Sequence, residues 1–198
     1  MAIDATKVLV GAPDQSATVG AVNYAPTSTT LPTDASSALG SGFTKCGYVS
    51  EDGLVISTDY GTKQIKDWSK STVRTLLDEF TGEVTFSFIQ TDYESLCAIF
   101  GSENVVKTNA SSSHGTQITV KIGAHIAAAK AYVFNMKDGN AKVRVVLPNA
   151  TPTLNGDLTF NAGDAINWSV KLTCGADTNG ESIYIYTDDG AATTTTGA

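Results

Sequence analysis

The sequence predicts a mainly β fold, a β-sandwich or small barrel flanked by one short α-helix. Several segments alternate apolar and polar residues with the period of a strand, most clearly at 84–88 and 166–174. Only the segment 91–101 repeats apolar residues with the period of a helix. Thr, Ser, Ala and Gly are abundant and only 17% of the residues are charged, a balance that favours strands and turns.

We expect three parts along the chain: an extended N-terminal arm or loop at 1–42, a β domain at 43–187 and a flexible C-terminal tail at 188–198. The arm has little periodic pattern and many turn-forming and hydroxyl residues. It is too apolar for a freely flexible segment, so we expect it to pack on the body of the protein or on a neighbour. The residues that indicate this are Val8, Leu9, Val10, Val19, Val22 and Leu31.

The β domain begins with two short strands predicted around a turn at 51–53, within FTKCGYVSEDGLVIST. A polar segment with one large aromatic residue, Trp68, follows at 60–80. The next strand, 84–90, places Val84, Phe86 and Phe88 on one face.

The helix is predicted to begin at Thr91, an N-cap residue that forms a capping-box pattern with Glu94. Gly101 is placed to end it. About ten residues are too few for a helix that is stable alone, so we expect it to lie on a sheet, with the strand 84–90 as the obvious neighbour.

Five further strands are predicted after the helix. TQITVKIG should direct Ile118, Val120 and Ile122 inward, and KAYVFNMKDGNAKVRVVLP should form a hairpin that turns at 138–140. The segment 166–174 gives the clearest strand, and 182–187 adds a last one.

No catalytic residue, metal ligand or cofactor site is predicted. His114 and His125 have no further ligand at metal-binding spacing, and Cys97 lies on the apolar side of the helix. Glu51 and Asp52 are interpreted as turn formers. Trp68 differs, because a Trp within a charged loop either folds back onto the core or is offered to a partner.

The formal net charge is −7, and the sequence has no run of consecutive Lys or Arg residues and no basic stripe. This pattern argues against tight nucleic-acid binding, which requires clustered Lys and Arg at phosphates. It is compatible with a wall past which nucleic acid slides. We expect no secretion signal and no membrane-spanning segment.

The ordered combination of VLVGAP (8–13), GYVSEDGL (47–54) and the stretch from DWSKST to CAIFG (67–101) resembles the major tail proteins of long, non-contractile-tailed phages. The similarity is greatest to those of phages that infect Gram-positive actinobacteria. In that family an aromatic-containing loop is followed by a strand, its hairpin partner and a short helix. Here these are Trp68, 73–80, 84–90 and 91–101.

The resemblance implies a structural virion protein without a cofactor. Six copies would close a ring, and rings would stack into a tail tube whose lumen conducts phage DNA during ejection without binding it specifically. Implied partners are other copies of the chain, the tape measure protein, and the tail terminator and distal tail proteins, with no membrane involved. The protein would be assembled in the host cytoplasm and reside in the virion tail.

Three groups of residues are candidates for roles in such a tube. The loop expected to mediate ring stacking contains Lys63, Lys66, Asp67, Trp68, Lys70 and Arg74. The candidates to face the lumen are Asp78, Glu79 and Glu83. The residues expected to pack the helix onto the sheet are Leu96, Ile99, Phe100, Phe86 and Phe88.

Two alternatives remain at this stage. One is another all-β assembly protein, either a capsid decoration protein or a secretion-tube subunit. The other is a carbohydrate-binding β-sandwich. An enzyme is not expected, because no acid–base pair, nucleophile triad or metal cluster is found in the sequence.

Overall fold

Ten strands and one helix form the part of the protein described by the computed structural model, residues 3–4, 7–16 and 18–191. The mainly β architecture with a single short helix is confirmed. In chain order the elements are β1 (Val22–Pro26), β2 (Thr44–Lys45), β3 (Val55–Lys66), β4 (Thr72–Phe88), α1 (Tyr93–Phe100), β5 (Val105–Thr108), β6 (Gln117–Val120), β7 (Lys130–Asp138), β8 (Ala141–Leu154), β9 (Trp168–Gly175) and β10 (Tyr184–Asp188).

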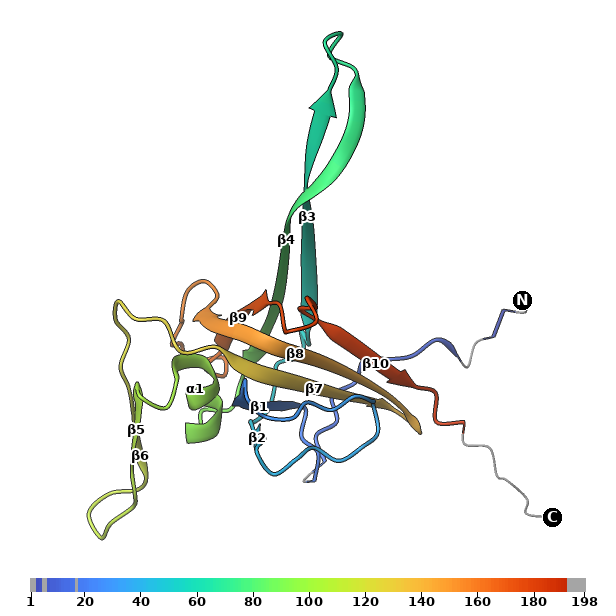
Figure 1. Ribbon diagram of the computed structural model, residues 1–198. Helices are drawn as coiled ribbons and strands as arrows, with labels where there is room; N and C mark the ends of the chain where they lie inside the picture. The colour runs from blue at the N-terminus through green and yellow to red at the C-terminus, as the bar shows by residue number, and fades with distance from the viewer. Residues whose placement is uncertain (1–2, 5–6, 17, 192–198) are drawn as a thin grey trace, which may run out of the picture.

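Eight of these strands form one antiparallel sheet in the order β2-β1-β7-β8-β9-β4-β3, with β10 paired to β8 (Figure 1). β10 pairs with the first half of β8 and β9 with the second half, so both use the edge of β8 that β7 leaves free. β5 and β6 form a separate two-stranded sheet beside the helix.

The large sheet curls around its core. The rings of Phe86 on β4 and Phe134 on β7 lie 5.1 Å apart, although two strands separate β4 from β7 in the sheet order. The segment 46–50 links the two sides, because the amide of Cys46 donates to the Val22 carbonyl and the amide of Ser50 donates to the Ser87 carbonyl. The sheet therefore approaches a sandwich or small barrel.

The helix begins one residue later than the sequence predicts. Asp92, and not Thr91, is the N-cap, and its Oδ1 accepts from the amide of Ser95 at 2.7 Å. The hydroxyl of Thr91 instead accepts a hydrogen bond from Trp168 Nε1 at 2.9 Å. Gly101 follows the last turn with φ 82°, a conformation that favours glycine, as predicted.

The helix also holds the segment that links the two sides of the sheet. Ser95 Oγ accepts from the amide of Gly47 at 2.8 Å, and Gln90 Oε1, just before the helix, accepts from the amide of Tyr48 at 3.2 Å. α1 contacts β8, β5, β6 and β2, so its main neighbour is not the strand that leads into it. Because β4 leads directly into α1, the N-terminus of α1 lies beside the segment 46–50 that links the two sides of the sheet.

Three further expectations need correction. The segments 73–80 and 84–90 are not two strands of a hairpin; they belong to the single strand β4, whose partner across the turn at Trp68 is β3. β2 pairs with β1 and not with β3, so the turn at 51–53 is not a hairpin turn. Ile122 lies beyond β6 and is 64% exposed.

The segment 1–42, which we expected to form an extended arm, contains β1, and this strand lies within the large sheet. β1 pairs with both β2 and β7, and Val22 is 2% exposed. Val8 and Val10, by contrast, are largely exposed. Of the expected tail at 188–198, residues 192–198 lie outside the described part, and the division into arm, domain and tail stays a prediction.

Candidate functional site

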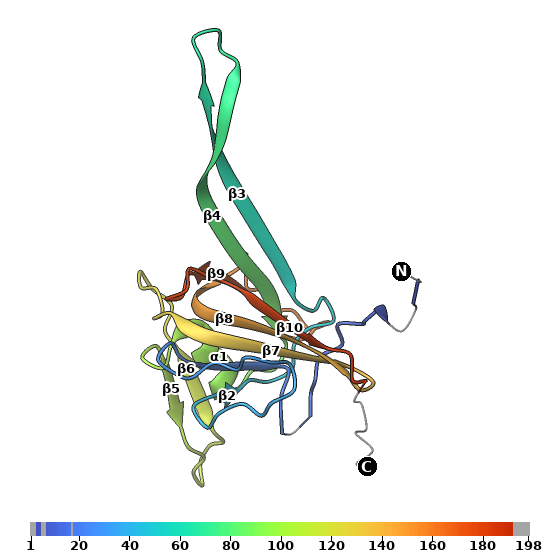
Figure 2. The same ribbon diagram turned by 45° about the vertical axis from the view of Figure 1, so that its right-hand side comes forward.

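A long two-stranded ribbon made by β3 and β4 projects from the body of the protein (Figures 1 and 2). Only the stretch 82–88 of β4 also pairs with β9; the stretch 72–81 pairs with β3 alone. A two-stranded ribbon without further cover is marginally stable by itself in water. The outer half of the ribbon is therefore a part of the described chain that no third strand stabilises.

The two faces of the ribbon differ in character. Cross-strand partners share a face, so the register assigns each pair to one side. One face extends the buried side of β4 toward the tip and has no charged residue in this stretch. Its pairs are Ile56–Val84, Thr58–Gly82 and Tyr60–Phe80. The opposite face carries the pairs Ser57–Glu83, Asp59–Thr81 and Gly61–Glu79.

The uncharged face is covered near the body and open farther out. Val84 is 0% exposed, whereas Tyr60 is 60% and Phe80 38% exposed. The rings of Tyr60 and Phe80 lie 5.0 Å apart and support each other across the ribbon. Exposed apolar side chains gathered on one face are typical of an interaction surface.

The tip of the ribbon is a turn built around Asp67. Its Oδ1 accepts from the amide of Ser71 at 2.8 Å and from the hydroxyl of Ser69 at 2.7 Å. These bonds, that of Ser69 first, lower the pKa of Asp67, so the carboxylate stays charged. Lys70 has φ 65°, a left-handed conformation that is uncommon outside glycine.

Trp68 at this tip is 102% exposed, so it does not fold back onto the core. This exposure rules out the interpretation in which Trp68 packs on the core of its own chain, and its contact with a partner stays a prediction. All six residues predicted for ring stacking lie on the outer part of the ribbon: Lys63, Lys66, Asp67, Trp68, Lys70 and Arg74.

The predicted lumen-facing residues fall into two groups. Glu79 and Glu83 share the charged face of the ribbon, and Glu83 Oε1 lies 3.2 Å from Lys171 Nζ on β9. Asp78 is the extra residue of a β-bulge, because Gly61 pairs with Glu79 while the next residue of β3 pairs with Leu77.

The residues predicted to pack the helix lie in one hydrophobic cluster. Leu96, Ile99, Phe86 and Phe88 are each at most 4% exposed. Phe100 is partly buried, with its ring 6.1 Å from that of Trp168.

A hollow that the sequence did not indicate lies at the end of the ribbon opposite its tip. It has a volume of about 740 Å³ and is lined by the turn before β3, the end of β4, the loop 157–165 and the start of β9. Four carboxylates line it and no Lys or Arg does: Glu51, Asp52, Asp157 and Asp164. Sequence alone could identify each as a loop residue, but only the fold brings them together.

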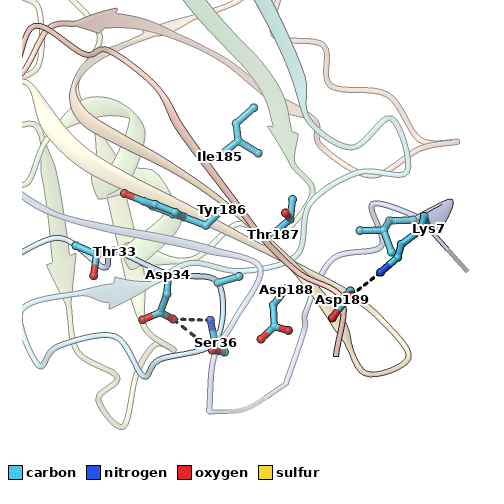
Figure 3. Close-up of a pocket in the computed structure, with 11 residues that line it drawn as sticks. Lys7, Thr33, Asp34, Ser36, Ile185, Tyr186, Thr187, Asp188 and Asp189 are labelled. Atoms are coloured by element: carbon cyan, nitrogen blue, oxygen red, sulfur yellow. Dashed lines mark hydrogen bonds and ion pairs between the residues drawn. The ribbon is translucent and has the colours of Figure 1, made fainter. Parts of the chain in front are cut away.

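A second hollow, of about 870 Å³, lies between the N-terminal segment and β10 (Figure 3). Lys7 Nζ lies 2.6 Å from Asp189 Oδ2 at one end of it. Asp34 Oδ1 accepts from the amides of Ser37 at 2.5 Å and Ser36 at 2.7 Å, which lowers the pKa of Asp34 to about 2. These carboxylates already have hydrogen-bonding partners and act as local structural anchors.

Within the described ranges, no group of three or more His, Cys, Asp or Glu side chains is placed to hold a metal ion. In the same part of the chain, no helix has the length and apolar character needed to cross a membrane.

The chain was compared with models of protein families and with curated proteins. The family model described as "Phage tail tube protein" matches residues 1–197, which is nearly the whole chain. None of the curated proteins matches.

Proposed function

Because the chain belongs to the phage tail tube protein family, we propose that six copies close a ring and that the rings stack into a tube through which phage DNA leaves the capsid. The protein is a structural component of the virion tail that assembles from multiple subunits. What we propose beyond the family is the number of subunits in a ring, the way the rings stack, and the passage of DNA through the lumen.

The observation that carries the proposal is the projecting ribbon. Its outer half pairs with no further strand of the described chain, its uncharged face exposes the rings of Tyr60 and Phe80, and its tip presents a fully exposed Trp68. β3 is also an edge strand of the large sheet, with one side free to pair with another strand. A subunit that pairs with identical neighbours needs such free edges and faces.

Residues Glu79 and Glu83 on the charged face are the proposed wall of the lumen. A wall with carboxylates repels the phosphate backbone at close range and gives DNA no cations to bind. The net charge of −7 supports a conduit that DNA passes without being held. Assembly in the host cytoplasm and contacts with tape measure, tail terminator and distal tail proteins complete the proposal.

Negative-stain electron microscopy of the purified protein tests the assembly. We expect rings with a central hole, or stacks of them. Monodisperse monomers would favour a solitary binding module, and shells or trimers would favour a capsid decoration protein. A cryo-EM reconstruction of the tube that shows a positively charged lumen would contradict the proposal that DNA slides past the wall without being bound.

A further inference from the structure

The β3–β4 ribbon carries opposite charges at its two ends. The outer stretch 62–76 contains Lys63, Lys66, Lys70 and Arg74 with a single carboxylate, Asp67, so its net charge is +3. The hollow at the other end is lined by four carboxylates and by no Lys or Arg. A single chain therefore has a basic projection and an acidic recess of complementary charge.

The chain path fixes these two features at opposite ends. Glu51 and Asp52 precede β3, Ile89 follows β4, and the tip lies at the connection between the two strands. The 12 residues of β3 span roughly 40 Å at the usual rise of a strand. The tip therefore cannot reach the hollow of its own chain, whereas the tip of a second copy displaced along the ribbon can.

Apolar side chains at the two features also match. Trp68 is fully exposed at the tip. Ile89, which lines the hollow, is 40% exposed, and Phe160, between the lining residues Thr159 and Asn161, is 65% exposed. An aromatic anchor surrounded by paired charges is a common arrangement at the centre of protein interfaces.

We propose that the hollow formed by 50–52, 87–89 and 157–169 receives the hairpin tip of a second copy of this chain. This inference rests on the proposed function, in which the tip mediates stacking, and adds the surface that accepts it. The cations of the tip meet the carboxylates of the hollow, and Trp68 packs near Ile89 and Phe160. Because donor and acceptor surfaces differ, the contact is head-to-tail and repeats from ring to ring without closing on itself.

Charge reversal on each side, alone and together, tests the pairing. The tip variant is Lys63→Glu with Lys66→Glu, and the hollow variant is Glu51→Lys with Asp157→Lys. No hydrogen bond or ion pair to a described residue is lost at any of these four positions. Each variant alone should lose pelletable tubes, because like charges then face each other, and an equimolar mixture of the two should regain them in part. The variant with all four changes should regain them fully.

Matched controls reverse an exposed charge elsewhere, with Lys121→Glu for the tip and Glu181→Lys for the hollow. Both should form tubes like the unchanged protein, and circular dichroism should show that all variants fold. A hollow variant that forms normal tubes, or a fourfold variant that does not regain them, would overturn the inference. An unchanged protein that forms no tubes would instead count against the proposed function itself.

Discussion

The buried hydroxyl of Tyr132 on β7 donates a hydrogen bond to the carbonyl oxygen of Ala98 at 2.5 Å. Ala98 lies in the last turn of α1, where carbonyl groups have no partner within the helix. Lys130 on the same strand donates to the carbonyl oxygen of Cys97 at 2.5 Å. One strand of the sheet thus caps the end of a helix that is too short to be stable alone.

Replacing Tyr132 with Phe should lower the free energy of unfolding by about 1–3 kcal/mol, because the Ala98 carbonyl would remain buried without a donor. The ring would keep its packing, so the effect isolates the hydroxyl. Urea denaturation of both proteins measures the difference. Tyr48→Phe, at a side chain that is 56% exposed, is the control and should have little effect. Equal stability of Tyr132→Phe and the unchanged protein would show that the bond contributes nothing.

Leu96→Asp should destabilise the protein by several kcal/mol, because it places a carboxylate without a partner at a side chain that is 2% exposed. The same change at Ile126, which is 74% exposed, provides the control and should be tolerated. Thermal unfolding followed by circular dichroism compares the two. A Leu96→Asp protein that stays folded and assembles normally would contradict the role of α1 as the cover of the core.

Local patterns predict β9 and the β7–β8 hairpin, but they divide β4 into two strands. β9 alternates buried and partly or fully exposed residues, and the segment 166–174 predicts it. The residue pattern of β4 changes along the strand, because its inner part is buried on one face and its outer part is largely exposed on both faces. The sequence of one continuous strand therefore resembles two separate segments, and Gly82 between them resembles a turn.

The candidate residues were predictable individually but not in their arrangement. An exposed Trp68 among Lys and Arg residues is visible in the sequence, and the structure places it at a tip. The carboxylates of the acidic hollow come from two loops more than 100 positions apart, such as Glu51 and Asp157. The pairings of β4 with β3 and with β9 bring these loops together, and no local signal encodes the pairing with β9.

Asp34 should contribute stability that is lost in acid. Its pKa falls from 3.8 to about 2 because the amides of Ser37 and Ser36 donate to the carboxylate. A carboxyl with a lowered pKa in the folded state stabilises the protein above its unfolded pKa, and the contribution disappears as the pH falls through the folded value. We therefore expect Asp34→Ala to be less stable than the unchanged protein at pH 5, by a difference that shrinks as the pH falls toward the folded pKa of about 2. Urea unfolding across this range provides the measurement, and a difference that does not depend on pH would exclude the charge as its cause.

Trp68→Ala should weaken tube formation and leave the folded monomer unchanged. The side chain has no contact that supports the fold, since it is fully exposed at the ribbon tip. Tube length in electron micrographs and monomer circular dichroism measure the two effects separately. Ile122→Ala, at another exposed apolar side chain, should alter neither. Unaltered tube lengths in the Trp68→Ala protein would remove this residue from the stacking contact.

Glu79→Lys should make the proposed lumen wall, which DNA passes without binding, bind DNA. Glu79 is exposed on the charged face of the ribbon, and each subunit of a tube would add one cation to the lumen. Cations at phosphates bind DNA in a manner that weakens steeply with salt. Short DNA should therefore sediment with the variant tubes at low salt, be released as salt rises, and not sediment with unchanged or Glu181→Lys tubes. If DNA does not sediment with the variant tubes at low salt, Glu79 does not face the lumen.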